Sequence, residues 1–253
     1  MYSPAEVARR YVETGKSKAA LPVGRMLLLG MLAGAFIALA GGSATFAVSY
    51  GGGLAGAAVF PAGLAMVLLA GSELFTGNCL LVIPLLERQL TWGRMLRSWG
   101  VVYLANVLGA GSVAALTVAA GTFDGVYESV VATAAAKAGL PFLTALRGVL
   151  CNFLVCIAVW MSLAAQSVPG KLAAMYLPIF TFVLCGFEHS VANMFYLPAG
   201  ILTAGRYGVA AEGLSWASMW TGNLLPVTLG NILGGCLVGV VYWAVYLRRG
   251  RRA

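Results

Sequence analysis

The sequence predicts an all-α membrane protein with six transmembrane helices in an inverted three-plus-three repeat. Hydrophobic residues make up 60% of the 253 residues and charged residues 9%, with a mean hydropathy of +0.89. A soluble domain has about 45–50% apolar and about 25% charged residues, so too few charges are present to cover a water-exposed surface. The charges that do occur fall in blocks between long apolar runs, and two short polar motifs occur once in each half.

The charge-free runs set the spans in order. About 20 apolar residues cross the hydrocarbon core as a helix. The first run, between Arg25 and Glu73, is long enough for two helices, and Gly41-Gly42 and Gly51–Gly53 supply the break between them. Alternating segments of about 10 residues, which would indicate a barrel, are absent from the sequence. The predicted spans are 26–49, 54–86, 97–120, 140–164, 172–203 and 217–247.

The remaining segments flank this core. Residues 1–25 form an N-terminal segment in which Ser3–Lys18 can become an amphipathic helix on the membrane surface, with Val7, Tyr11 and Val12 toward lipid. Residues 26–247 form the transmembrane domain, with repeat halves at about 26–120 and 140–247. Residues 248–253 form a basic tail.

The distribution of Lys and Arg predicts the orientation. These residues concentrate in the N-terminal arm, in the loop between the second and third spans, and in the tail. Positive loops stay on the cytoplasmic side, so both termini are expected in the cytoplasm. The net charge of +8 is then a topology signal, and no nucleic-acid partner is expected.

Two motifs recur in the two halves. Gly71-Ser-Glu73-Leu-Phe-Thr-Gly-Asn78 aligns with Gly186-Phe-Glu188-His-Ser-Val-Ala-Asn193, and Asn106-Val-Leu-Gly-Ala110 aligns with Asn231-Ile-Leu-Gly-Gly235. Each half has three spans, an odd number, so the halves insert in opposite directions. Polar residues inside the second and fifth spans indicate that these helices are broken, as in transporters built from inverted repeats.

Three ionisable residues lie at membrane depth, where they indicate function by default: Glu73, Glu188 and His189. We expect both carboxylates to be structural, accepting hydrogen bonds from backbone N–H groups freed at the helix breaks. Direct substrate binding is the alternative, which an anionic substrate would disfavour. His189 is the only histidine, and its place in a broken helix favours a functional role over that of a core residue satisfied by hydrogen bonds.

These residues sit in stretches that resemble the formate/nitrite transporter family. They are GSELFTGN (71–78), RGVLCNFLVCIAVWMS (147–162), CGFEHSVANMFYLPAGI (185–201) and NLLPVTLGNILGG (223–235). The resemblance covers essentially the whole chain. It implies an aquaporin-like subunit in a homopentamer of the bacterial cytoplasmic (inner) membrane, with one pore per subunit for formate, nitrite or hydrosulfide.

The resemblance also implies a role for each matching residue. His189 and Thr76 form the central gate and proton relay. One apolar constriction, on the cytoplasmic side, is formed by Leu64, Leu74 and Val155, and another, on the periplasmic side, by Phe60 and Phe182. Polar pore residues are Asn152 and Asn231, and Lys137 and Lys18 attract the anion at the two vestibules, with Lys16 competing for the place of Lys18. Structural residues at the breaks are Glu73, Glu188, Phe75, Ser190 and Asn193.

The predicted function is passage of small monovalent anions, formate first, by a channel or proton-coupled mechanism. Apolar rings favour a neutral or partly dehydrated species, and lysines at the mouths concentrate anions. Nitrite and hydrosulfide are alternatives within the class. A water or neutral-solute channel is disfavoured because paired Asn-Pro-Ala motifs are missing, and a membrane enzyme because His189 and Glu188 lack a nucleophile or metal partner. No cofactor is expected.

Overall fold

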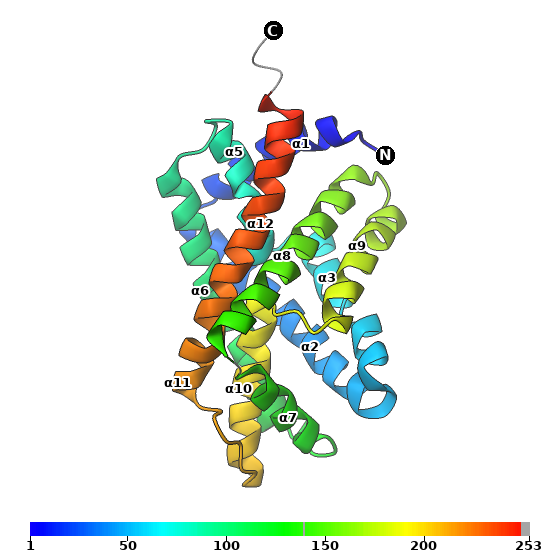
Figure 1. Ribbon diagram of the computed structural model, residues 1–253, viewed down its shortest axis with the longest axis vertical. Helices are drawn as coiled ribbons and strands as arrows, with labels where there is room; N and C mark the ends of the chain where they lie inside the picture. Colours follow the sequence, from blue (N-terminus) through cyan, green and yellow to red (C-terminus); the bar gives the residue numbers. More distant parts are fainter. Residues whose placement is uncertain (139, 249–253) are drawn as a thin grey trace.

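The structure, a computed structural model, describes residues 1–138 and 140–248, and all secondary structure in these residues is helical (Figure 1). The elements are α1 (Pro4–Ala20), α2 (Val23–Val59), α3 (Ala62–Ala70), α4 (Phe75–Asn78), η1 (Cys79–Leu81), α5 (Val82–Leu86), α6 (Trp92–Ala119), α7 (Tyr127–Lys137), α8 (Pro141–Ala164), α9 (Val168–Leu184), α10 (Ser190–Tyr207), α11 (Trp216–Ser218), the π-helical turn η2 (Met219–Leu224) and α12 (Leu225–Tyr246). Of the predicted tail, residues 249–253 lie outside the described residues.

Helix α2 doubles back on itself near its end. Gly52 has φ 74° and ψ −177°, a conformation that glycine adopts readily and other residues avoid. Beyond it, Gly56 lies against Val48, and Gly63 lies against Ala40. The first two predicted spans are therefore neighbours joined at Gly52, whereas Gly41-Gly42 stays helical.

Four apolar helical stretches in the described residues are long enough to cross a bilayer: Val23–Ala70, Trp92–Ala119, Pro141–Ala164 and Trp216–Tyr246. Two shorter apolar stretches, Phe75–Leu86 and Val168–Leu184, accompany them. The chain leaves helical geometry between Gly71 and Leu74, where Gly71 is left-handed, and between Cys185 and His189, where Gly186 has φ 65°. Both non-helical segments coincide with the repeated motif.

The second repeated motif brings helices into close contact. A Cβ atom at Gly109 would lie 2.0 Å from the Met31 carbonyl oxygen, and one at Gly234 would lie 2.1 Å from that of Val149. Glycine at these positions lets α6 approach α2 and α12 approach α8 closely, as in helix packing within lipid. The N-x-L-G sequence therefore places an asparagine beside a close helix crossing in each half.

Helix α1 packs on protein rather than on lipid. Val7 and Tyr11 are 0% and 1% exposed, within the main apolar core. The expectation that they face lipid was wrong, because α1 lies against α5, where its Gly15 contacts Pro84. Arg97 ties down its end by donating to the Ala19 carbonyl at 2.8 Å. Helix α1 and the last turns of α12 lie at this end of the molecule, which we call the terminal end (Figure 1).

Helix α7 was not predicted as an element. It follows the third span at the opposite end of the molecule, which we call the distal end (Figure 1). Its last residue, Lys137, points inward and is half-buried. This helix therefore carries a lysine from outside the apolar spans toward the second break.

Candidate functional site

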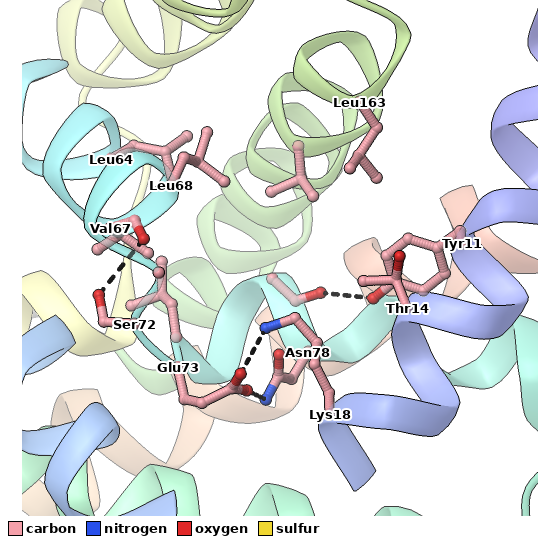
Figure 2. A pocket seen from close by; sticks show the side chains of 14 residues that line it. Tyr11, Thr14, Lys18, Leu64, Val67, Leu68, Ser72, Glu73, Asn78 and Leu163 are labelled. Atoms are coloured by element: carbon pink, nitrogen blue, oxygen red, sulfur yellow. Dashed lines mark hydrogen bonds and ion pairs between the residues drawn. The ribbon is translucent and has the colours of Figure 1, made fainter. Parts of the chain in front are cut away.

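Three cavities follow one another through the subunit. The Lys18 cavity, about 270 Å³, is lined in part by Tyr11, Thr14 and Lys18 of α1 (Figure 2). It shares Leu64 and Leu74 with a central cavity of about 10 Å³. The central cavity shares Phe60, Phe182 and His189 with a Lys137 cavity of about 120 Å³ on the distal side. The shared residues place two wide chambers on either side of a narrow, apolar centre.

The central cavity brings together all five residues predicted for the constrictions: Leu64, Leu74, Val155, Phe60 and Phe182. Phe60 and Phe182 meet edge to face with ring centroids 5.7 Å apart, a favourable aromatic arrangement. Ile37 and Ile179 complete the lining and were missed. Nothing in the sequence separates these two isoleucines from the many other apolar residues of the spanning helices.

His189 lies between the central and Lys137 cavities with both ring nitrogens engaged. Its Nδ1 accepts the backbone N–H of Ala192 at 3.1 Å, which caps the start of α10. Its Nε2 lies 3.0 Å from Thr76 Oγ1. Because Nδ1 accepts, the neutral ring carries its hydrogen on Nε2 and donates it to Thr76. The Thr76 hydroxyl hydrogen is then left for another acceptor.

Glu73 sits at the first break, at the wall of the Lys18 cavity. One oxygen accepts from Lys18 Nζ at 2.8 Å and the other from Asn78 Nδ2 at 2.8 Å (Figure 2). The Lys18 side chain is 27% exposed but that of Glu73 only 6%. The ammonium therefore faces the cavity while the carboxylate lies behind it. This contact selects Lys18 over Lys16, which pairs with Glu13 on the exposed side of α1.

Glu188 has the corresponding arrangement at the second break. Its carboxylate pairs with Lys137 at 3.2 Å, and Asn193 and Asn223 also donate to it. Lys137 is again the more exposed partner, 17% against 6%. Each lysine thus presents positive charge to its cavity, while the buried carboxylate offsets its long-range field. The lysine also stacks over Tyr196, 5.2 Å from the ring centre.

The predicted partners of the two carboxylates were wrong. In the described residues, lysine and asparagine side chains donate to Glu73 and Glu188, whereas backbone N–H groups at the breaks go elsewhere. Asn106 Oδ1 accepts from Phe75 N at 3.0 Å, and its amide donates to the carbonyls of Gly30 and Glu73. A neutral amide both donates and accepts, so one side chain can satisfy N–H and C=O groups together.

Asn231 makes the same set of bonds in the second half. Its Oδ1 accepts from Ser190 N at 2.9 Å, and its Nδ2 donates to the carbonyls of Gly148 and Glu188, each at 2.9 Å. Asn231 was expected in the pore, but its amide is occupied by backbone and it lines none of the three cavities. Asn106 was missed as a site residue, although its repeated motif identifies it.

The remaining predicted site residues are buried next to the two helix breaks, outside the lining of the three cavities. Asn152 is fully buried and donates to the carbonyls of Thr76 and Asn231 at 3.2 and 2.7 Å. It therefore lies outside the three cavities as well. Phe75 packs edge to face on Trp99 and Tyr103. Ser190 is buried beside Asn231, to which its backbone N–H donates.

Comparison with known proteins gives the same picture over the whole chain. Residues 5–244 match the formate/nitrite transporter family. A probable formate transporter of Methanothermobacter thermautotrophicus is 38% identical over 97% of this chain and 97% of that protein. The formate channel FocA of Escherichia coli K12 is 36% identical, covering 97% of this chain and 94% of FocA.

Solved structures of the same family superpose on this chain. A chain described as an FNT family ion channel superposes with a TM-score of 0.84 at 28% identity, covering 94% of this chain and 98% of that one. A pentameric formate channel with formate bound superposes with a TM-score of 0.79 at 30% identity, covering 89% and 98%. Such proteins are transporters and channels of the membrane rather than enzymes. The chain is a multi-pass membrane protein that belongs to the formate/nitrite transporter family.

Proposed function

We propose that the protein carries small monovalent anions, formate first, across the bacterial cytoplasmic membrane through one pore in each subunit. The observation that carries this proposal is the row of three cavities, with a lysine at each wide chamber and His189 at the narrow centre. The pore residues fit nitrite and hydrosulfide by charge and size, and these remain the alternative substrates. The formate channels among its relatives favour formate.

The architecture we infer is an inverted repeat of three spans in each half, with broken second and fifth helices. Lys18, Glu73, Asn78 and Asn106 of one half correspond in their contacts to Lys137, Glu188, Asn193 and Asn231 of the other. The excess of Lys and Arg in the N-terminal arm, the loop before α6 and the tail supports a cytoplasmic location for both termini. The superposed pentameric channel supports a homopentamer for this chain.

Transport begins with local attraction. An anion in the Lys18 or Lys137 cavity meets an ammonium, because the paired carboxylate lies behind it. Apolar rings beyond each lysine then oppose a fully hydrated ion, since its water is lost there without replacement. Only a donor at the centre lowers this barrier. The His189 ring lines the central cavity, and Thr76 lies behind it, outside the lining of the three cavities, with its hydroxyl 3.0 Å from the ring.

His189 and Thr76 form the central gate and, in a proton-coupled cycle, the relay. A doubly protonated imidazole would pass its Nε2 hydrogen toward a carboxylate oxygen of formate. The O–H bond of formic acid forms as the N–H bond breaks, which leaves a neutral ring with its hydrogen on Nδ1. Water must then return a proton to Nε2 and take the one on Nδ1 before the resting ring and its bond from Ala192 are restored. The second hydrogen must sit on Nδ1, and this breaks the bond from Ala192. The neutral ring is therefore the resting form, and charging it loosens the cap of α10.

The test of the proposed function is uptake by proteoliposomes of labelled formate, nitrite and hydrosulfide at two pH values. We expect the protein to equilibrate formate far faster than empty vesicles do, with nitrite and hydrosulfide slower. Thr181→Val, an exposed substitution on α9 away from the cavities, serves as the matched control. Uptake of all three anions no faster than in empty vesicles would rule out the proposal.

The aromatic pair should set the size limit of the pore. In Phe60→Ala or Phe182→Ala, loss of one ring opens the passage between the central and Lys137 cavities. We therefore expect larger or more hydrated anions to pass at rates relative to formate that rise about tenfold or more. Current measurements in planar bilayers check this. Unchanged conductance and selectivity in both single variants and the double variant would place these rings outside the conduction path.

A further inference from the structure

A separate groove lies on the outside of the subunit, between α6, α10 and the segment that leads into α12. Its volume is about 340 Å³ and its lining is almost wholly apolar. Val107, Gly111 and Ala115 form one wall, and Met194, Pro198 and Leu202 form the other. Trp216, half-exposed, lies at its edge. The volume falls in the usual range of small-ligand pockets.

Each wall of the groove is one face of a helix, because its lining residues are spaced four apart. Residues four apart lie on one side of a helix, so each wall is a single row. Helix α6 starts at the terminal end and α10 starts at the second break, and both run to the distal end (Figure 1). From Val107 to Ala115, the groove wall on α6 rises about 12 Å at about 1.5 Å per residue. Half of a hydrocarbon core of about 30 Å is about 15 Å, so the groove fits within one leaflet.

The next residue of the α10 row makes the distal end of the groove polar. Arg206 follows Leu202 by one turn, and its Nη1 donates to the carbonyls of Val118 and Ala119 at 2.6 and 3.2 Å. Its Nη2 lies 3.9 Å from Asp124 Oδ1. The two side chains are 40% and 63% exposed. The Tyr207 hydroxyl also donates to Asp124 Oδ1, and the Arg206 guanidinium lies over the Tyr207 ring, so a headgroup would share these two exposed opposite charges with Tyr207.

We propose that this groove binds one acyl chain of a glycerophospholipid from the distal leaflet, with its zwitterionic headgroup on Arg206 and Asp124. A phosphate suits the guanidinium, and the ammonium of phosphatidylethanolamine suits the carboxylate. The apolar walls lie at the depth of the hydrocarbon region because α6 is long and apolar enough to span the bilayer and α10 packs beside it. Trp216 lies where tryptophan is enriched, near the boundary between chains and headgroups. The lipid would brace α10, the half-helix that carries His189 at its start.

Gly111→Leu tests the acyl-chain site. A Cβ atom at Gly111 meets only open space, so leucine fills the groove without a clash and favours the helix. Gly100→Leu is the matched control, because Gly100 lies on the same helix with open space around it and outside the groove. Native mass spectrometry of protein extracted in mild detergent should find phosphatidylethanolamine retained by the wild type and by Gly100→Leu. Retention by Gly111→Leu should fall about tenfold.

Asp124→Asn tests the headgroup. The wild type should retain phosphatidylethanolamine over phosphatidylglycerol, and the variant should lose this preference. Equal retention of lipid by wild type and Gly111→Leu overturns the proposal. Equal retention of both headgroups by the wild type reduces the site to non-specific lipid contact and overturns it as well. A third contrary result is a disulfide cross-link from Leu202→Cys to a neighbouring subunit, because a protein side chain would then occupy the groove.

Discussion

Replacing His189 with phenylalanine is expected to leave a folded pore that takes up formate at least about tenfold more slowly. Phenylalanine keeps the flat ring that stacks on Phe182 but removes both nitrogens, the one that contacts Thr76 and the one that caps α10; loss of one cap costs about 1 kcal/mol, too little to unfold the pore. Hydrogen bonds to charged groups contribute about 1.5–3 kcal/mol, which corresponds to a factor of about ten or more in rate. Uptake of labelled formate into proteoliposomes, compared with wild type and with Thr181→Val, measures the effect.

His189→Asn separates the two roles of the ring. Asparagine is a good N-cap, so the bond from Ala192 can be kept, and its amide can still donate toward Thr76. It does not titrate, whereas histidine ordinarily does so near pH 6.5. If His189 relays protons, uptake by the wild type rises as the external pH falls from 8 to 5, and the asparagine variant loses this rise. An unshifted pH profile in His189→Asn leaves the residue as a neutral donor only.

The hydrogen bonds of the His189 ring link proton transfer to the backbone of α10. A single histidine at membrane depth indicates proton chemistry from the sequence, because no competing group titrates near neutral pH there. The structure adds that Nδ1 is already occupied by the backbone of α10. A second proton on the ring must displace that bond. Proton transfer and the geometry of the second break are therefore coupled, which no property of the sequence could indicate.

Spacing and composition predicted most of the fold. The charge-free runs located the apolar helices, and Gly51–Gly53 located the reversal at Gly52. These features follow from local rules of burial and backbone freedom. Helix α1 was placed in lipid because an amphipathic pattern is the same whether the apolar face meets lipid or protein. Only the contact with Pro84 and the bond from Arg97 decide between them.

The site was predictable where residue type alone decides the role. The five apolar residues of the central cavity meet as the family resemblance implies, and each lysine reaches a cavity. Asparagine was harder to interpret, because one amide can line a pore or satisfy a backbone. Asn106 and Asn231 take the second role in the structure, with matching partners in the two halves. Substitution of either asparagine should therefore lower the thermal stability of the protein more clearly than it changes the rate of formate uptake.

Asn231→Leu is expected to lower the thermal stability of the folded protein by a large amount. Leucine removes the partner of Ser190 N and of the carbonyls of Gly148 and Glu188, all in the buried second break. An unsatisfied buried group costs about 1–3 kcal/mol, so three such groups should cost about 3 kcal/mol or more. For a chain of this size, about 3 kcal/mol corresponds to a fall of about 6–12 °C in Tm.

Thermal unfolding in detergent, followed by circular dichroism, measures this change against Thr181→Val, because the exposed Thr181 hydroxyl bonds only to the Leu177 carbonyl of its own helix. Asn106→Leu should lower Tm by a similar amount, because Asn106 holds Phe75 N and the Gly30 and Glu73 carbonyls in the same way. A pore-lining Asn231 would behave differently: its leucine variant would keep the wild-type Tm and lose formate uptake. That outcome would return Asn231 to the conduction path and leave the second break to be supported by other residues.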